Sequence, residues 1–315
     1  MNNLKKIGLT ALAGTLVASS AYAGSMSATG SAKLTYKGAE NVTIGNGFSM
    51  TDEVTLSGGG EMDNGWNVTV SVQLDGDEGT GNSYDNRSVT IDMGDSGTLV
   101  FNGHGGSMPV NTIDDKLPTA NEEAHGAIGG TEGLGKGAGS DGWWKYSNSS
   151  LMDGVAIDLG YTPSGSTEFE GSIEAGLTYT GVDGLTVGIA GGENKATEGA
   201  VVDNVNMYMT YAMENGFTIG FQSNESDSQT ANADVDMTGY AVSYAMSEEL
   251  TVSLGRNEVQ YESGAGKSDQ EATGINFSYV MGSMTLSGGH STVDNVAGVE
   301  ATDNSGYEVN LAFAF

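Results

Sequence analysis

The chain has 315 residues with 50 Gly, 3 Pro and no Cys, and its formal charge is −30. Nucleic acid binding requires a basic surface, so this acidity excludes nucleic acid as a partner. The absence of Cys excludes disulfides, thiolate zinc sites and cysteine nucleophiles, and the length suits two ordinary domains or one large β architecture.

Residues 1–23 have the pattern of a secretory signal peptide. Two lysines near the start are followed by an apolar stretch over 7–17 and by the cleavage pattern Ala21-Tyr22-Ala23. An N-terminal helix or a membrane anchor is the alternative, but this apolar run is shorter than the about 20 residues of a spanning helix. We therefore predict export, with a mature chain over 24–315.

The rest of the chain alternates apolar and polar residues, which is typical of strands with one apolar face. In 66–74, for example, every second residue from Trp66 to Leu74 is apolar. Most such runs are near the about 9–11 residues of a tilted transmembrane strand. The pattern predicts sixteen strands, at 29–37, 51–59, 65–74, 86–93, 97–103, 142–148, 154–162, 171–180, 184–191, 204–212, 216–223, 235–245, 249–257, 272–280, 283–290 and 305–315.

Short and long connections take turns between these strands. Tight turns such as 94–96 and 281–282 alternate with long polar segments, the longest of which is 104–141. An even number of antiparallel strands with this rhythm indicates a 16-stranded transmembrane β-barrel, with short periplasmic turns and long extracellular loops. A soluble β-sandwich or a β-solenoid is the alternative, but the sandwich lacks this asymmetry of loops and the solenoid repeat is missing.

With these features the chain resembles the Gram-negative general porins, particularly the alphaproteobacterial porin family. Its last strand, with Tyr307, Phe313 and the terminal Phe315, is similar to the assembly signal of outer-membrane proteins. The resemblance implies an outer-membrane location, a homotrimer with a water-filled pore in each subunit, and a third loop (104–141) that folds inward as the constriction. It also implies the lipid bilayer, lipopolysaccharide and the barrel-assembly machinery as partners.

Strand parity assigns charged residues to the pore if the apolar side of each strand meets lipid, where a charge is costly. The predicted pore wall contains Glu53 together with Lys33, Lys37, Lys145, Asp92, Asp158, Glu174 and Glu308. The predicted constriction carries the loop carboxylates Asp114, Asp115, Glu122, Glu123 and Glu132, with Lys116 and Lys136. Arg87 and Arg256 share the parity of their apolar neighbours, and either a rim position or a bend into the pore mouth stays open for both.

The function expected from this pattern is passive diffusion of ions and small hydrophilic solutes through a mildly cation-selective pore. A solute-specific channel is one alternative, but a sugar channel needs inward aromatics and parity places most aromatics outward. A plugged structural or adhesive barrel is the other alternative.

Enzyme and cofactor sites find little support. The chain has three His residues, and one of them, His290, precedes Ser291 at a strand end. Nothing recognisable flanks Ser291, however, and no third, orienting group can be assigned. The segment 129–137 is rich in Gly but lacks the Ser or Thr of a phosphate-binding loop. We expect no cofactor, and weak calcium binding by the acidic group Glu225, Asp227, Asp234 and Asp236 stays open.

Overall fold

The computed structural model describes residues 25–40, 45–76, 84–126, 133, 137–138, 141–164, 171–195, 201–262 and 264–315. The signal-peptide prediction for 1–23 lies outside the described residues. The described residues form sixteen strands, as the alternation predicts. They are β1 (Met26–Ala39), β2 (Phe48–Glu61), β3 (Asn67–Asp75), β4 (Tyr84–Asp92), β5 (Thr98–His104), β6 (Trp143–Met152), β7 (Val155–Thr162), β8 (Ser172–Val182), β9 (Leu185–Asn194), β10 (Val202–Ala212), β11 (Phe217–Ser228), β12 (Val235–Ala245), β13 (Leu250–Tyr261), β14 (Gln270–Met281), β15 (Met284–Asp294) and β16 (Asn304–Ala314).

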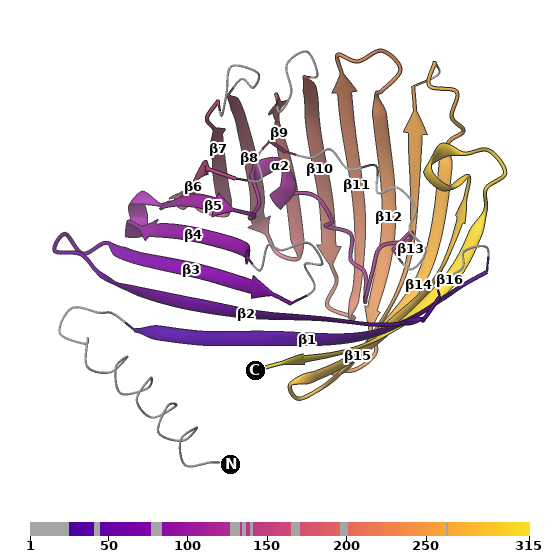
Figure 1. The fold of residues 1–315 in the computed structure, drawn as a ribbon, viewed down its shortest axis with the longest axis horizontal. Helices are drawn as coiled ribbons and strands as arrows, with labels where there is room; N and C mark the ends of the chain where they lie inside the picture. Colours follow the sequence, from indigo (N-terminus) through magenta and orange to yellow (C-terminus); the bar gives the residue numbers. More distant parts are fainter. Residues whose placement is uncertain are drawn as a thin grey trace.

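The strands form a closed barrel in which each strand pairs antiparallel with its neighbours in sequence, and β1 pairs with β16 (Figure 1). The last residue takes part in this closure, because Phe315 N donates to Gly30 O at 2.9 Å and Gly30 N donates to Phe315 O at 2.8 Å. Closure leaves no unpaired sheet edge, which is the condition for a sheet that crosses a bilayer. The predicted fold class is confirmed.

The two sides of each strand differ in polarity, as the period of two requires. In β10, Met207 and Met209 are exposed on the outer face, whereas Asn204 and Asn206 are buried on the inner face. The outer face of the barrel is therefore apolar, and the inner face carries hydroxyl, amide and charged side chains.

Several strands extend further toward the long loops than the hydrophobic pattern predicts. β11 continues to Ser228 and β15 to Asp294, beyond the predicted ends at 223 and 290. Ladder hydrogen bonds continue there although the outward residues become acidic, and Glu225 faces Asp236 across β11 and β12. Apolar alternation marks only the part of a strand that meets an apolar environment, so it underestimates the strand length.

The segment 105–142 is here called the inner loop, and its described residues lie inside the barrel. It begins with the short helix α2 (Pro109–Thr112), which contacts β7, β8, β9 and β10 (Figure 1). The buried apolar clusters lie between this loop and the wall. One joins Val110 and Ile113 to Ala190, and the other joins Ala124 to Ala272 and Val293. Among the described residues no helix is both long and apolar enough to span a membrane.

Candidate functional site

The inner loop is attached to the barrel wall along its whole described course, starting at α2. The Glu174 carboxylate of β8, 1% exposed, accepts hydrogen bonds from Val110 N at 2.9 Å and from Ala138 N at 2.5 Å. Asn206 of β10 donates to Val110 O at 3.1 Å. One inward carboxylate thus holds both the outgoing and the returning arm of the loop.

The middle of the loop follows the wall from β11 to β14. Lys116 N donates to Gln222 Oε1 at 2.9 Å, and Ala120 N donates to Ser253 Oγ at 2.8 Å. Leu117 packs against the glycine surface of β12, where a Cβ on Gly239 would lie 2.7 Å from Leu117 Cδ1. Larger side chains at these wall positions would therefore push the loop away from the wall, toward the middle of the lumen.

The tip of the loop reaches the seam between β16 and β1. Asn121 Nδ2 donates to Glu308 Oε1 at 2.8 Å, and Asn121 Oδ1 accepts from Ser287 Oγ at 2.6 Å and from Asn310 Nδ2 at 3.1 Å. The Glu308 carboxylate also pairs with Lys37 Nζ at 3.0 Å. Glu308 is 2% exposed and Lys37 is 41% exposed, so only the lysine end of the pair is open to the lumen.

The base of the loop is held by a second pair. His104 Nδ1 lies 2.5 Å from Asp141 Oδ1, which joins the end of β5 to the residues that precede β6. The side chain of Trp143 is buried on the inner side and donates from Nε1 to Gly105 O at 3.2 Å. The loop is thus closed at its base and tied at its tip.

Opposite charges meet where the tip approaches β1. Burial, followed by the charge of Glu308, raises the pKa of Glu122 above its ordinary value, while the nearby Lys33 and Lys37 act in the opposite direction. Asp115 adds a further negative charge to the surroundings of Glu122. Lysines of the wall and carboxylates of the loop therefore form a local transverse field.

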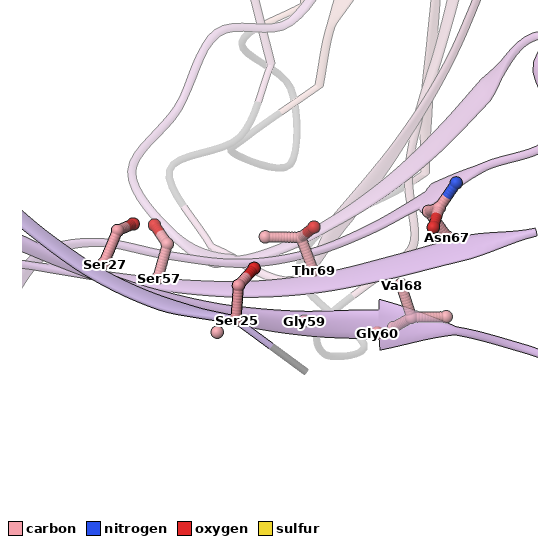
Figure 2. A pocket seen from close by; sticks show the side chains of 9 residues that line it. Ser25, Ser27, Ser57, Gly59, Gly60, Asn67, Val68 and Thr69 are labelled. Carbon is pink, nitrogen blue, oxygen red and sulfur yellow. The ribbon is translucent and has the colours of Figure 1, made fainter. Parts of the chain in front are cut away.

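The inner wall of β1, β2 and β3 carries hydroxyl and amide groups. Ser31 Oγ donates to Glu53 Oε1 at 3.1 Å, and Gln73 Nε2 donates to the other oxygen of that carboxylate. Near the short-turn end of these strands a hollow of about 380 Å³ is lined by small residues. Its Ser27, Ser57 and Thr69 side chains point to the same side of the sheet (Figure 2). The hollow thus presents hydroxyl groups, which can both donate and accept hydrogen bonds.

The residues predicted for the site differ in how far they are buried in the described structure. Glu174 and Glu308 face inward but are covered by the loop, whereas Lys33, Lys37 and Lys145 are only half-buried. The remaining predicted wall carboxylates, Glu53, Asp92 and Asp158, lie on the inner parity of β2, β4 and β7. The loop carboxylates Asp114, Glu122 and Glu123 are half-buried and Asp115 is exposed, whereas Glu132 and Lys136 lie outside the described residues.

The two arginines left open by parity both face outward. Arg87 is a cross-strand neighbour of the outward Val72, and Arg256 is a neighbour of the outward Tyr240. Arg256 pairs with Glu271 at 2.8 Å near the long-loop end of β13 and β14. Neither side chain bends into the pore mouth.

Among the described residues, the features considered for catalysis and metal binding form no such site, and most of the segment 129–137 lies outside the described residues. His290 is exposed on the outer face and Ser291 is buried on the inner face of β15, so the two side chains point apart. Within the described ranges no group of three or more His, Asp or Glu side chains is arranged to hold a metal ion.

The amides of the inner wall are the functional residues that charge parity misses. Each of the side chains that hold the loop occupies a polar position of its strand, where the pattern predicts only an inward direction. The signal available in the sequence is an Asn or Gln at an inward position, because an amide that becomes buried there requires a hydrogen-bond partner. These residues are Asn206, Gln222, Asn276 and Asn310, together with Ser253 and Ser287.

Comparisons with known proteins agree with this geometry. A family model described as Gram-negative porin matches residues 8–298. An anion-selective porin from Comamonas acidovorans has a similar structure, with 13% identity and a TM-score of 0.65 over 92% of this chain and 99% of that chain.

Two further solved structures are similar to this chain to the same degree. A triple mutant of Rhodopseudomonas blastica porin has 15% identity and a TM-score of 0.68, over 92% of this chain and 100% of that chain. OmpT, an outer membrane protein of Vibrio cholerae, has 14% identity and a TM-score of 0.68, over 92% and 97%. No curated protein matches the sequence.

Proposed function

Because the chain belongs to the Gram-negative porin family, whose members are outer-membrane channels and not enzymes, we propose that it is a general diffusion pore. Its solutes are ions and small hydrophilic molecules, and no chemical step is involved. The proposal includes a homotrimer that contacts the bilayer and lipopolysaccharide and is inserted by the barrel-assembly machinery.

One observation carries this proposal. The inner loop is hydrogen-bonded to the wall, through Glu174, Gln222, Ser253 and Glu308, in place of standing free across the lumen. A loop held in this way narrows a barrel of sixteen strands, whose interior is too wide for side chains to fill. The passage then runs between the acidic side of the loop and the hydroxyl-bearing wall of β1 to β3.

A mild preference for cations is part of the proposal. The solved neighbour from Comamonas acidovorans is described as anion-selective, so this barrel architecture alone does not set the sign. Selectivity follows the charges at the narrowest part. Here Glu122 and Asp115 of the loop stand near Lys33 and Lys37, and the pairing of Lys37 with Glu308 offsets one of the positive charges.

A solute-specific channel fits the inner surface less well. Trp143 and Tyr208 face inward, but Trp143 is buried below the inner loop and Tyr208 packs against the cluster of Val110, Ile113 and Ala190. Aromatic side chains covered by the loop offer no stacking surface to a sugar. A plugged barrel is disfavoured because the described part of the loop lies against the wall, to which it is hydrogen-bonded through Glu174, Gln222 and Ser253.

The experiment is a reversal-potential measurement on the purified protein in planar bilayers with a salt gradient. The proposal predicts a small potential of the sign that indicates cation preference, and no block by sugars at millimolar concentration. An anion-selective potential contradicts the proposed selectivity, and a saturable block by a solute favours the specific channel.

A further inference from the structure

Methionine recurs at the short-turn end of the barrel. Six of the seven short turns, all of them within the described residues, begin with Met at or just after the end of a strand. The backbone of this residue closes the hairpin, as Met62 N donates to Trp66 O at 2.7 Å and Met213 N donates to Phe217 O at 2.7 Å. The six residues are here called the methionine rim, and they are Met62, Met93, Met152, Met213, Met246 and Met281.

Strand parity directs the side chains of the methionine rim outward. Met213 lies two positions after the exposed Tyr211, and Met281 lies two positions after the exposed Tyr279. Alternate residues of a strand share a face, so each methionine extends the outer face by one step. Exposed acidic residues of the turns follow directly, and examples are Asp63, Asp153 and Glu214. The methionine rim therefore lies where the apolar outer face meets water.

The exposed thioethers of this rim are open to oxidation. Met62 is 45% exposed, Met152 65%, Met246 56% and Met281 37%. Because the chain contains no Cys, methionine sulfur is its most readily oxidised group. A two-electron oxidant such as hydrogen peroxide transfers one oxygen atom to the sulfur. The S–O bond of the sulfoxide forms, the O–O bond of the peroxide breaks, and the peroxide is reduced to water.

Two other methionines are buried between the inner loop and the wall. Met108 immediately precedes α2 and is 0% exposed, and Met237 on the inner face of β12 is 4% exposed. Both fit closely, since a Cβ on Gly160 would lie 2.7 Å from Met108 Cε and a Cβ on Gly133 would lie 3.0 Å from Met237 Cβ. A sulfoxide makes an apolar side chain polar and disrupts such packing. Oxidation of these two residues would therefore disturb the inner loop, whereas the methionine rim points away from the lumen.

We propose that the methionine rim is a sacrificial oxidation site, at which peroxide-class oxidants on the periplasmic side are consumed as methionine sulfoxide. The methionines beneath the inner loop are spared because they are buried, and oxidation of a thioether follows its exposure. The oxygen atoms are added on the outer face at the short turns, so the shape of the lumen is retained. This activity goes beyond conduction and requires no solute in the pore.

Mass spectrometry of the unmodified chain tests the order of oxidation. The folded protein in phosphatidylcholine vesicles is treated with dilute hydrogen peroxide, and the oxygen gained by each methionine-containing peptide is measured over time. Met62, Met152 and Met246 are expected to react at least about tenfold faster than Met108 and Met237. In denaturant all methionines should react at similar rates. Equal rates in the folded protein, or the same order in denaturant, overturn the proposal.

A variant without the exposed thioethers tests the sacrificial role. Four substitutions are combined, Met62→Leu, Met152→Leu, Met246→Leu and Met281→Leu, and the control combines Met207→Leu with Met209→Leu in the middle of the apolar outer face. With less peroxide than methionine, the share of oxygen taken up by Met108 and Met237 should rise about twofold in the rim variant. The control should leave that share unchanged. A rim variant with an unchanged share overturns the sacrificial role, and circular dichroism shows whether each barrel has folded.

Conductance separates this inference from the proposed function. Protein whose methionine rim has been oxidised, with Met108 and Met237 intact, is expected to give the same current steps in planar bilayers as untreated protein. Loss of the steps on rim oxidation overturns the sacrificial role. Protein that does not conduct even before treatment overturns the proposed pore, and the order of oxidation still decides this inference.

Discussion

Asn121 donates a hydrogen bond of 2.8 Å to Glu308, and this contact ties the tip of the inner loop to the strand that closes the barrel. The same carboxylate pairs with Lys37 of β1, the other strand of the seam. The position of the loop therefore depends on a junction between the first and last strands, which are the most distant in sequence. Barrel closure and the shape of the pore share one network of side chains.

Replacing Asn121 tests whether this network holds the loop. Asn121→Ala removes three side-chain hydrogen bonds, to Glu308, Ser287 and Asn310, and is expected to let the tip move. Single-channel recordings should show current noise at least about twofold higher, since a lost hydrogen bond to a charged group costs about 1.5–3 kcal/mol. Thr119→Ala in the same loop is the control, and equal noise in both variants contradicts the role of Asn121.

The Lys37–Glu308 pair should couple the two strands of the seam. A double-mutant cycle with Lys37→Met and Glu308→Gln is expected to give a coupling free energy of about 0.5–3 kcal/mol in the free energy of unfolding. The partial exposure of Lys37 places the value in the lower part of that range. Denaturant unfolding in lipid vesicles measures it, and additive single effects would show that the pair contributes nothing to closure.

Selectivity should depend on pH through Glu122. Burial raises the pKa of this carboxyl above the ordinary value of 4.5, so it takes up a proton at a higher pH than an exposed glutamate. As the pH falls from neutral, the loss of this charge should reduce the cation preference at a higher pH than the loss of an exposed glutamate's charge would. Reversal potentials measured from pH 8 to pH 4 test this, and Glu122→Gln should remove the early part of the change.

The raised pKa of Glu122 also affects the stability of the fold. The pKa of Glu122 is higher in the folded chain than in the unfolded chain, so its ionised form destabilises the fold above the folded pKa. Glu122→Gln should therefore be at least as stable as the unmodified protein at pH 7, and this advantage should disappear as the pH falls through the raised pKa. A variant that is less stable at pH 7 would contradict this sign.

Replacing a glycine of the wall below the loop by alanine should disturb the loop at some positions and not at others. Gly239→Ala places a Cβ 2.7 Å from Leu117 Cδ1 and is expected to shift the loop, with a cost of about 1–3 kcal/mol and an altered conductance. Gly255→Ala on the next strand is the matched control, because its Cβ would meet other atoms only at 3.7 Å or more. Equal effects of the two substitutions would show that the loop does not rest on this surface.

The architecture can be predicted from the sequence because successive side chains of a strand point to opposite faces and only the outer face of the barrel is apolar. Alternation locates all sixteen strands, and the length of 104–141 marks the loop that enters the lumen. Parity also gives the inward direction of Lys37, Glu174 and Glu308. The doublet Trp143-Trp144 shows the limit of that rule, since one of two adjacent aromatics must face inward, where Trp143 is buried below the loop.

The partners of these inward residues cannot be predicted in the same way. Parity separates inside from outside, but the partner of an inward side chain depends on the path of a loop with no repeating pattern. Glu174 and Glu308 were predicted as pore-wall charges, and the structure shows them bonded to the loop. The side chain that joins Glu308 to the loop, Asn121, is uncharged and separated from it by 187 positions.

The most direct test of an open, loop-narrowed pore is the single-channel conductance of the purified protein in planar bilayers. The attachment of the inner loop to the wall through Glu174 and Glu308 predicts discrete ohmic current steps that grow in proportion to salt concentration. Inserted protein that produces no steps, while circular dichroism shows a folded β-barrel, would contradict it and indicate that the loop closes the lumen.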